Sequence, residues 1–201
     1  MVLQPGTPSR HEYRPAMKIA PDHLILIRHA TPIPHRDQPS SRWPLSREGR
    51  ADSRRLATLL GLREAHFVAS DEDKAVATIH ELAGHRPVLT DARFGEVRRP
   101  YVDGDYRAVA RDYLLGAQPD GWEDQSVVTE RFEAAVVDHA GRAAAAGHPL
   151  VIGSHGLALT LWLGDHVDLR PDLVAFWDEL RMPDVIAVDL SAGTATRPVT
   201  G

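Results

Sequence analysis

The stretch Leu24-Ile25-Leu26-Ile27-Arg28-His29-Ala30-Thr31-Pro32 decides the fold of this chain. Its four consecutive aliphatic residues, two of them β-branched, predict a strand that is buried on both faces, as strands are inside a parallel sheet. The apolar run stops abruptly at Arg28 and His29. Open α/β sheets usually bind ligands beyond the carboxyl ends of their strands, so this pair is a candidate ligand site.

The composition limits the class of protein. The chain has 201 residues, of which 43% are hydrophobic and 25% charged, which suits one globular domain with a sizeable core. A net charge of -5 argues against non-specific binding to nucleic acid or to an anionic membrane, although a local basic pocket can still bind a small anion. There is no cysteine, which excludes disulfides, thiolate zinc sites and a cysteine nucleophile. No apolar run suits a membrane span or a signal peptide, so we expect a cytoplasmic protein without a membrane partner.

Strands and helices are expected to alternate along most of the chain. Residues 1–22 contain four prolines among polar residues and predict a flexible tail, which leaves one domain over residues 23–201. Further strands are predicted at 66–70, 87–90, 150–154 and 184–190, and helices at 46–60, from 71, at 122–146 and at 156–163. This order predicts an α/β fold, a three-layer α/β/α sandwich with a mostly parallel central sheet.

Two helix starts and one irregular segment are predicted from local signals. Ser46 is expected to cap the first helix, with Leu56, Leu59 and Leu60 on its inner face. Ser70 with Asp73 three places on resembles a capping box, so the second helix is expected to start at residue 71. Residues 94–113 show no regular pattern and are predicted to be an irregular, charged segment.

A second strand end repeats the pattern of the first. His155 follows the aliphatic run at 150–153, as His29 follows the run at 24–27. If the two strands are neighbours, the imidazoles converge at one edge of the sheet. A single histidine at a strand end is more often structural, but a pair beside Arg28, whose planar guanidinium matches phosphate oxygens, favours phosphate chemistry.

These motifs resemble the histidine phosphatase superfamily, also called the phosphoglycerate mutase-like family. Leu26-Ile27-Arg28-His29-Ala30-Thr31 is similar to its L-x-R-H-G-x-T signature, with Ala30 in the usual glycine place. Residues 44–50 resemble the P-L-T-x-x-G stretch that opens its first helix, and residues 152–156 its second-histidine S-H-G motif. Residues 94–96 fall where the family places an L-x-E acid. The resemblance covers residues 24–190 and implies the family's α/β/α fold.

The resemblance also implies roles for single residues. His29 would attack phosphorus and become phosphohistidine, Arg28 and His155 would bind phosphate oxygens, and Glu96 would protonate the leaving alkoxide. Burial beside a phosphate dianion would favour a protonated Glu96, whereas Arg98 and Arg99 would oppose it. A solvated loop carboxylate is an equally good interpretation of Glu96 from the sequence alone.

The chain departs from the family at its second phosphate-binding arginine. Aligning residues 69–78 with the family's S-S-P-x-x-R-A-x-x-T pattern puts Lys74 in that place, among Asp71, Glu72 and Asp73. Lysine keeps the charge but loses the bidentate geometry, and the acidic neighbours oppose a dianion. Lys74 is one of only two lysines among 23 basic residues, so it is either a specific choice or a chance one.

Several other residues are weaker candidates. Thr31 and Arg99 are possible substrate contacts, and residues 98–107 form either a specificity wall for an anionic or aromatic substrate or a charged loop. No histidine spacing typical of a metal site is present, so neither a metal nor a cofactor is expected.

The sequence as a whole predicts a metal-independent phosphomonoester hydrolase acting on a small phosphorylated metabolite. Hydrolysis is favoured over mutase chemistry because the segment between Glu96 and Leu150 is short and lacks an arginine-rich lid. The alternative is a phosphate-ester-binding protein on the same fold, in which Lys74 and the acidic turn have cost the catalysis.

Overall fold

A computed structural model describes residues 24–197, so the predicted tail at 1–22 lies outside the described residues. Within these described residues, six strands form one sheet in the order β3-β2-β4-β1-β5-β6. They are β1 (Leu24–Arg28), β2 (His66–Ala69), β3 (Val88–Thr90), β4 (Leu150–Ser154), β5 (Asp184–Asp189) and β6 (Thr194–Thr196). The first four strands are parallel, while β5 pairs antiparallel with β1 and β6 antiparallel with β5. The predicted mostly parallel sheet is confirmed.

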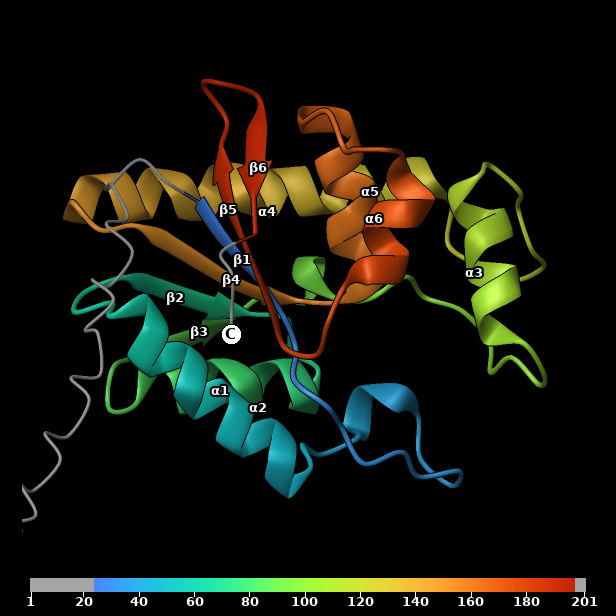
Figure 1. The fold of residues 1–201 in the computed structure, drawn as a ribbon, viewed down its shortest axis with the longest axis horizontal. Helices are drawn as coiled ribbons and strands as arrows, with labels where there is room; N and C mark the ends of the chain where they lie inside the picture. Colours follow the sequence, from blue (N-terminus) through green and yellow to red (C-terminus); the bar gives the residue numbers. More distant parts are fainter. Residues whose placement is uncertain (1–23, 198–201) are drawn as a thin grey trace, which may run out of the picture.

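Helices cover both faces of this sheet, which gives the predicted three layers (Figure 1). One face carries α1 (Arg47–Leu60) and α2 (Asp73–Ala83). The other face carries α3 (Tyr106–Leu114), α4 (Gln125–Ala146), α5 (Gly156–His166) and α6 (Leu173–Glu179). Two short 3-10 turns, η1 (Ser40–Arg42) and η2 (Ala92–Phe94), lie in the connecting segments.

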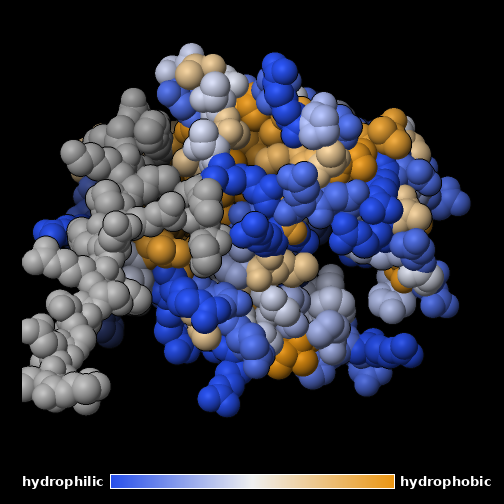
Figure 2. All heavy atoms as spheres, viewed as in Figure 1, coloured by the Kyte–Doolittle hydropathy of each residue, from blue (hydrophilic) through white to orange (hydrophobic). Residues whose placement is uncertain are grey.

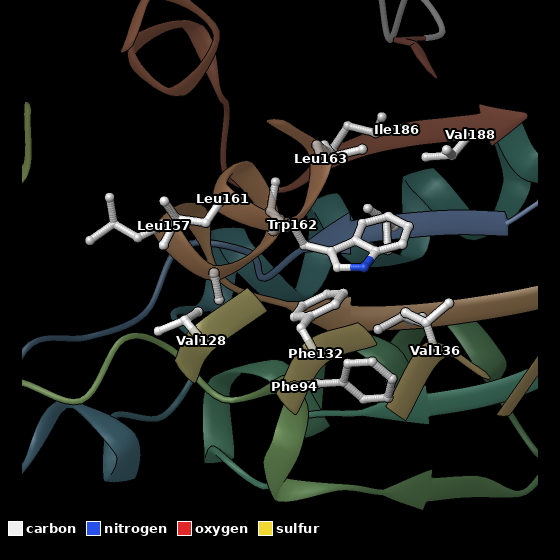
Figure 3. Packing of buried hydrophobic residues seen from close by; sticks show 14 of the residues in the cluster. Phe94, Val128, Phe132, Val136, Leu157, Leu161, Trp162, Leu163, Ile186 and Val188 are labelled. Carbon is white, nitrogen blue, oxygen red and sulfur yellow. The ribbon is translucent and has the colours of Figure 1, made fainter. Parts of the chain in front are cut away.

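Strand β1 divides the core into two clusters because successive side chains of a strand point to opposite faces. Ile25 and Ile27 pack with the cluster under α1 and α2, and Leu24 and Leu26 pack with the cluster under α4 and α5. In the second cluster Trp162 of α5 stacks on Phe132 of α4, with ring centroids 5.5 Å apart (Figure 3). The site-bearing strand is therefore held from both sides.

Helix α1 starts as predicted, but one residue of its inner face was wrongly assigned. The Ser46 hydroxyl accepts a hydrogen bond from the Gly49 backbone N–H at 2.9 Å and caps the helix. Leu56 and Leu60 are buried, whereas Leu59 is 49% exposed. Leu59 lies three residues from Leu56 and is turned to the edge of the narrow stripe that the sheet covers.

The largest error of the sequence-based prediction lies in residues 94–113. Residues 106–114 form helix α3, in which the Asp105 carboxylate accepts from the Ala108 backbone N–H at 3.1 Å.

Helix α2 begins at Asp73, two residues later than predicted, and Glu72 precedes it without making a side-chain cap. The Ser70 hydroxyl instead accepts from the Glu72 backbone N–H at 3.2 Å, and this contact keeps residues 70–72 as a turn.

The described residues contain neither a helix suited to span a membrane nor a cluster of metal-binding side chains. Between residues 24 and 197, none of the helices has both the length and the apolar character needed to cross a membrane. Within the same residues, no group of three or more histidine or carboxylate side chains is placed to hold a metal ion.

A chain of polar contacts joins Arg93, Asp91, His139 and His66, and we expect it to contribute measurably to stability. The Asp91 carboxylate accepts hydrogen bonds from Arg93, including one from Nη2 at 2.7 Å, and from His139 Nε2 at 3.1 Å. His139 Nδ1 in turn lies 2.9 Å from His66 Nε2. The hydrogen bonds from Arg93 are the largest cause that lowers the pKa of Asp91, to about 2.

Replacing Asp91 by Asn is expected to lower the free energy of unfolding by about 2 kcal/mol at pH 7. Because the folded pKa lies below the unfolded value, this stabilisation is present above about pH 4 and is lost as the pH falls toward 2. Urea unfolding at pH 7 and pH 3 measures it. Asp138→Asn is the control, since Asp138 also pairs with Arg93 but is 52% exposed, and about 0.5 kcal/mol or less is expected. Equal losses in the two variants would contradict the prediction.

Candidate active site

The parallel pairing of β1 with β4 brings the two predicted strand ends together. Arg28 lies opposite Ser154 in the register, and the His29 backbone N–H donates to the Ser154 carbonyl at 3.0 Å. The rings of His29 and His155 consequently face each other with centroids 5.1 Å apart and planes inclined by 58°. The convergence of the two imidazoles at one edge of the sheet follows from the register alone.

The contacts of His29 determine which ring nitrogen is available. Its Nδ1 lies 2.9 Å from the Ala30 carbonyl, which can only accept, so Nδ1 carries the proton and Nε2 keeps its lone pair. Burial is the first cause that lowers the pKa of His29 well below the usual range, followed by the positive charges of His155 and Lys74. The imidazole is therefore neutral at pH 7, the form a nucleophile requires.

The loop after His29 is anchored to helix α2. The Ala30 backbone N–H donates to the Thr78 hydroxyl at 3.0 Å, and that hydroxyl donates to the Lys74 carbonyl at 2.7 Å. Ala30, which stands where the family usually has glycine, is fully buried. The backbone next to His29 and the backbone of Lys74 are thus joined by hydrogen bonds through Thr78.

Arg28 has donor capacity that the protein does not use. Its Nη1 donates to the Leu180 carbonyl at 2.7 Å, while its buried Nε has no hydrogen-bond partner within residues 24–197. A side chain at Gly156 would crowd this guanidinium, because a Cβ there would lie 3.3 Å from Arg28 Nε. Glycine at the start of α5 therefore lets the cation approach the strand ends closely.

His155 is fully buried and is also only partly satisfied. Its Nε2 lies 2.9 Å from the Ser70 hydroxyl and 3.4 Å from Glu72 Oε1, whereas its Nδ1 has no partner among the described residues. Burial is the first cause that lowers the pKa of His155 well below the usual range, and the positive charge of Lys74 is the second.

Lys74 points into the site but is already paired. Its ammonium donates to the Ser40 carbonyl at 2.8 Å and to Glu72 Oε2, and only 6% of its side chain is exposed. Glu72 is turned inward, and its Oε1 also accepts from the Glu96 backbone N–H at 2.9 Å. The sequence did not distinguish this inward carboxylate from its acidic neighbours: Asp71 is exposed, and Asp73 pairs with Arg42 at 3.3 Å.

Glu96 lies at the N-terminus of α5. Its Oε1 accepts from the backbone N–H groups of Val97 at 3.0 Å and Ala158 at 2.9 Å, and its Oε2 accepts from Leu157 at 3.3 Å. Burial is the largest cause that changes the pKa of Arg28, and it lowers that pKa. The negative charge of Glu96 raises the pKa of Arg28 and so counteracts burial. Glu96 is therefore a fixed part of the site and not a solvated loop carboxylate.

A pocket of about 720 Å³ opens beside these residues, between segments 35–43 and 99–106, and we name it the loop pocket. The loop from β1 to α1 and the segment before α3 lie on one side of the molecule (Figure 1), and Figure 2 shows the surface hollowed between them at the right. Arg99 and Tyr106 line the loop pocket. The exposed Thr31 donates its hydroxyl to the Met182 carbonyl at 3.3 Å.

Comparison with known proteins places this arrangement in a family. No curated protein matches the sequence. A solved mycobacterial glucosyl-3-phosphoglycerate phosphatase aligns with a TM-score of 0.66 and 21% identity, over 88% of this chain and 97% of that one. Bacillus stearothermophilus YhfR aligns with a TM-score of 0.65 and 26% identity, over 89% and 96%. A phosphoglycerate mutase from Bacillus anthracis aligns with a TM-score of 0.62 and 18% identity, over 88% and 92%.

The family assignment follows from the length of the match as well as from the site. The model of the histidine phosphatase superfamily, branch 1, matches residues 24–182, a range that runs from the start of β1 past both histidine motifs. The fold and the order of the motifs agree with this match. The chain therefore belongs to the histidine phosphatase superfamily.

Proposed function

We propose that the protein is a metal-independent phosphomonoester hydrolase that forms a phosphohistidine at His29 and acts on a small phosphorylated metabolite. The observation that carries this proposal is the hydrogen bond from His29 Nδ1 to the Ala30 carbonyl. It leaves the Nε2 lone pair available beside Arg28 and His155. The Arg28 Nε, unpartnered among the described residues, is a donor for a phosphate oxygen. His155 Nδ1 is a second donor when the Ser70 hydroxyl donates to His155 Nε2, which leaves the ring proton on Nδ1. These groups offer the charge stabilisation that a transferring phosphoryl group needs.

The first step is displacement at phosphorus. His29 Nε2 attacks the phosphorus, the bond from phosphorus to the ester oxygen breaks, and the departing alkoxide takes a proton from the carboxyl group of Glu96. The proton is assigned to Glu96 Oε2, because Oε1 accepts two short backbone hydrogen bonds whereas Oε2 accepts only the 3.3 Å contact. Arg28 binds the equatorial oxygens, where negative charge is spread in the transition state.

The second step regenerates the enzyme. Water attacks the phosphohistidine, its proton returns to the Glu96 carboxylate, and the bond from phosphorus to nitrogen breaks to release inorganic phosphate. His29 Nε2 then recovers its lone pair, while Nδ1 keeps its proton on the Ala30 carbonyl throughout. Splitting hydrolysis into two displacements lets the same nitrogen serve as nucleophile and leaving group.

Two observations support this proposed function. The structural relatives include a protein named a phosphatase and one named a phosphoglycerate mutase, and both names denote chemistry on phosphate esters. The net charge of -5 and the absence of cysteine suit a cytoplasmic enzyme that acts on a small metabolite and not on nucleic acid.

The inward orientation of Glu72 favours an alternative function, which is binding of a phosphate ester without catalysis. Because Glu72 pairs with Lys74, the cation that replaces the family's second arginine brings little net charge to a bound phosphate. A protein with this arrangement can bind a phosphate ester weakly without turning it over. The alternative is therefore a phosphate-ester-binding protein on the same fold.

Release of inorganic phosphate from aryl and alkyl phosphomonoesters in the presence of EDTA tests the proposal. Turnover is expected, with a phosphoprotein that is stable to alkali and labile to acid after rapid quenching. Saturable binding of phosphate esters without release or phosphoprotein would instead establish the binding protein.

Replacing Glu72 by Gln is expected to strengthen anion binding. Glutamine retains an oxygen for the Glu96 backbone N–H but removes the charge that neutralises Lys74. We expect the inhibition constant of inorganic phosphate to fall about tenfold, as removal of a nearby like charge implies. Inhibition of turnover measures it, or direct calorimetry if turnover is slow.

Asp73→Asn is the matched control for this change. Asp73 lies in the same turn and carries the same charge, but its side chain is 45% exposed and pairs with Arg42. Less than a twofold change is expected, because solvent screens that charge. An equal gain in both variants would show only a general charge effect, and weaker binding in Glu72→Gln would show that Glu72 supports the ligand.

A further inference from the structure

The loop pocket is larger than a phosphoryl group requires. Its volume of about 720 Å³ falls in the range of sites that hold whole small-molecule ligands. It adjoins the candidate active site in two places. The Ser40 carbonyl that binds Lys74 belongs to its wall, and so does Tyr106, whose hydroxyl interacts with the charges of Glu96 and Arg28. The loop pocket is therefore placed to receive the alcohol part of a phosphate ester whose phosphate lies at His29.

Two aromatic rings hold the guanidinium of Arg99 in a defined position in the loop pocket. Its guanidinium lies 4.3 Å over the ring of Tyr106 and 5.5 Å from the ring of Trp122. Aromatic faces hold a cation without neutralising it by an opposite charge. Burial is the first cause that raises the pKa of Tyr106, to about 12, so this ring stays neutral beneath the arginine.

The hydrogen bonds of Arg99 are incomplete. Among the described residues its buried Nε has no partner, its Nη1 makes a 3.4 Å contact with the Pro100 carbonyl, and the guanidinium also donates to the neutral Tyr106 hydroxyl. Within residues 24–197 no carboxylate lies within ion-pair distance of Arg99.

Three other arginines near Arg99 are, in contrast, paired with carboxylates. Arg98 and Arg131 both pair with Glu123, at 2.6 and 3.0 Å, and Arg107 pairs with Asp178 at 2.6 Å. Arg99 thus presents an uncompensated planar cation in a pocket whose other ionic lining side chains include Arg36 and a single carboxylate, Asp37. A planar guanidinium in this state matches a carboxylate or another oxyanion.

We propose that the loop pocket is a subsite for a second anionic group, and that the preferred substrates are phosphomonoesters whose alcohol part carries a carboxylate or a comparable oxyanion bound by Arg99. This proposal rests on the proposed hydrolase function and deepens it. The subsite fixes the alcohol part while the ester phosphate lies at the strand ends, so its binding energy appears chiefly in KM.

A pair of aryl phosphates that differ in one group tests the subsite. The value of kcat/KM is measured for phenyl phosphate and for 4-carboxyphenyl phosphate, with 4-sulfophenyl phosphate to separate carboxylate from other anions. The wild type is expected to prefer the anionic esters by about tenfold or more, the value of one charge-assisted contact. Arg99→Gln should abolish this preference, and the loss should appear in the KM of the anionic esters.

Two controls keep the result interpretable. Arg98→Gln changes the neighbouring arginine, whose side chain is 75% exposed and paired with Glu123, and should leave the preference intact. Arg99→Lys keeps the charge without the fork and should give an intermediate preference. Thermal unfolding shows whether the loss of the aromatic contacts has disturbed the fold.

The failure of the subsite is distinguishable from failure of the hydrolase. Equal use of neutral and anionic esters by the wild type, or a preference that survives Arg99→Gln, overturns the subsite while phenyl phosphate turnover still supports the hydrolase. If neither ester is hydrolysed, calorimetry with the same two esters decides: a binding preference lost in Arg99→Gln supports the subsite without the catalysis, and no preference overturns it.

Discussion

His29→Ala is expected to lower kcat/KM for any phosphomonoester that the protein hydrolyses by about 10⁴-fold, the usual cost of removing a covalent nucleophile. The alanine variant has no atom that can attack phosphorus, so no phosphoprotein should form. The fold should persist, because within residues 24–197 the only hydrogen bond of this side chain is to the adjacent Ala30 carbonyl. Phosphate release and rapid-quench labelling measure both effects.

The control for this prediction is another histidine that lies away from the site. His80 is exposed on α2, and His80→Ala should leave both the rate and the labelling unchanged. Turnover that survives His29→Ala would place the nucleophile elsewhere. Loss of turnover with retained phosphate binding would agree with the proposed role, because Arg28 and His155 are still present to hold the anion.

Arg28→Lys is expected to lower kcat/KM by about 10²-fold although it keeps the positive charge. The guanidinium is already oriented by its hydrogen bond to the Leu180 carbonyl, and its buried Nε, which has no partner within residues 24–197, can bind a phosphate oxygen. Lysine offers a point charge without this planar arrangement of donors, so the transition state loses more than the ground state. The loss should therefore appear mainly in kcat.

A surface arginine provides the matched control. Arg50 pairs with Glu81 at 3.0 Å between α1 and α2, and Arg50→Lys should leave kcat/KM within about twofold. If Arg28→Lys also stayed within about threefold, the planar guanidinium would not be needed, and the charge at the strand end would suffice. Unfolding of both variants in urea separates an effect on catalysis from an effect on stability.

Much of the fold was predictable because its signals are local. Four consecutive aliphatic residues favour burial, so the run before Arg28 predicted a buried strand, and the similar run before His155 predicted a second one. That these two strands are neighbours is shown by the structure. The cap at Ser46 and Gly147 at the end of α4 are also signals read within a few residues. Helix α3 was missed because its polar residues and the preceding glycine hid a short amphipathic helix that is completed by packing on α5 and α6.

The candidate site divides in the same way. Arg28, His29, Glu96 and His155 were selected from motifs, and the parallel register of β1 and β4 brings the histidines face to face. The geometry of Glu72 had no counterpart in the sequence, where three successive acidic residues look alike. Only the tertiary structure shows that the middle one turns inward to pair with Lys74 and to approach His155.

The sequence by itself determined which strands are central, where they end and which chemical groups those ends carry, because buried apolar runs and the residues that interrupt them are local properties. The tertiary structure alone decided which charges are neutralised and which remain available. Lys74 is paired by Glu72, whereas Arg99 rests on two aromatic rings without a carboxylate among the described residues. Such pairings join segments far apart in the chain, and their energies depend on distance and burial, which no linear pattern records.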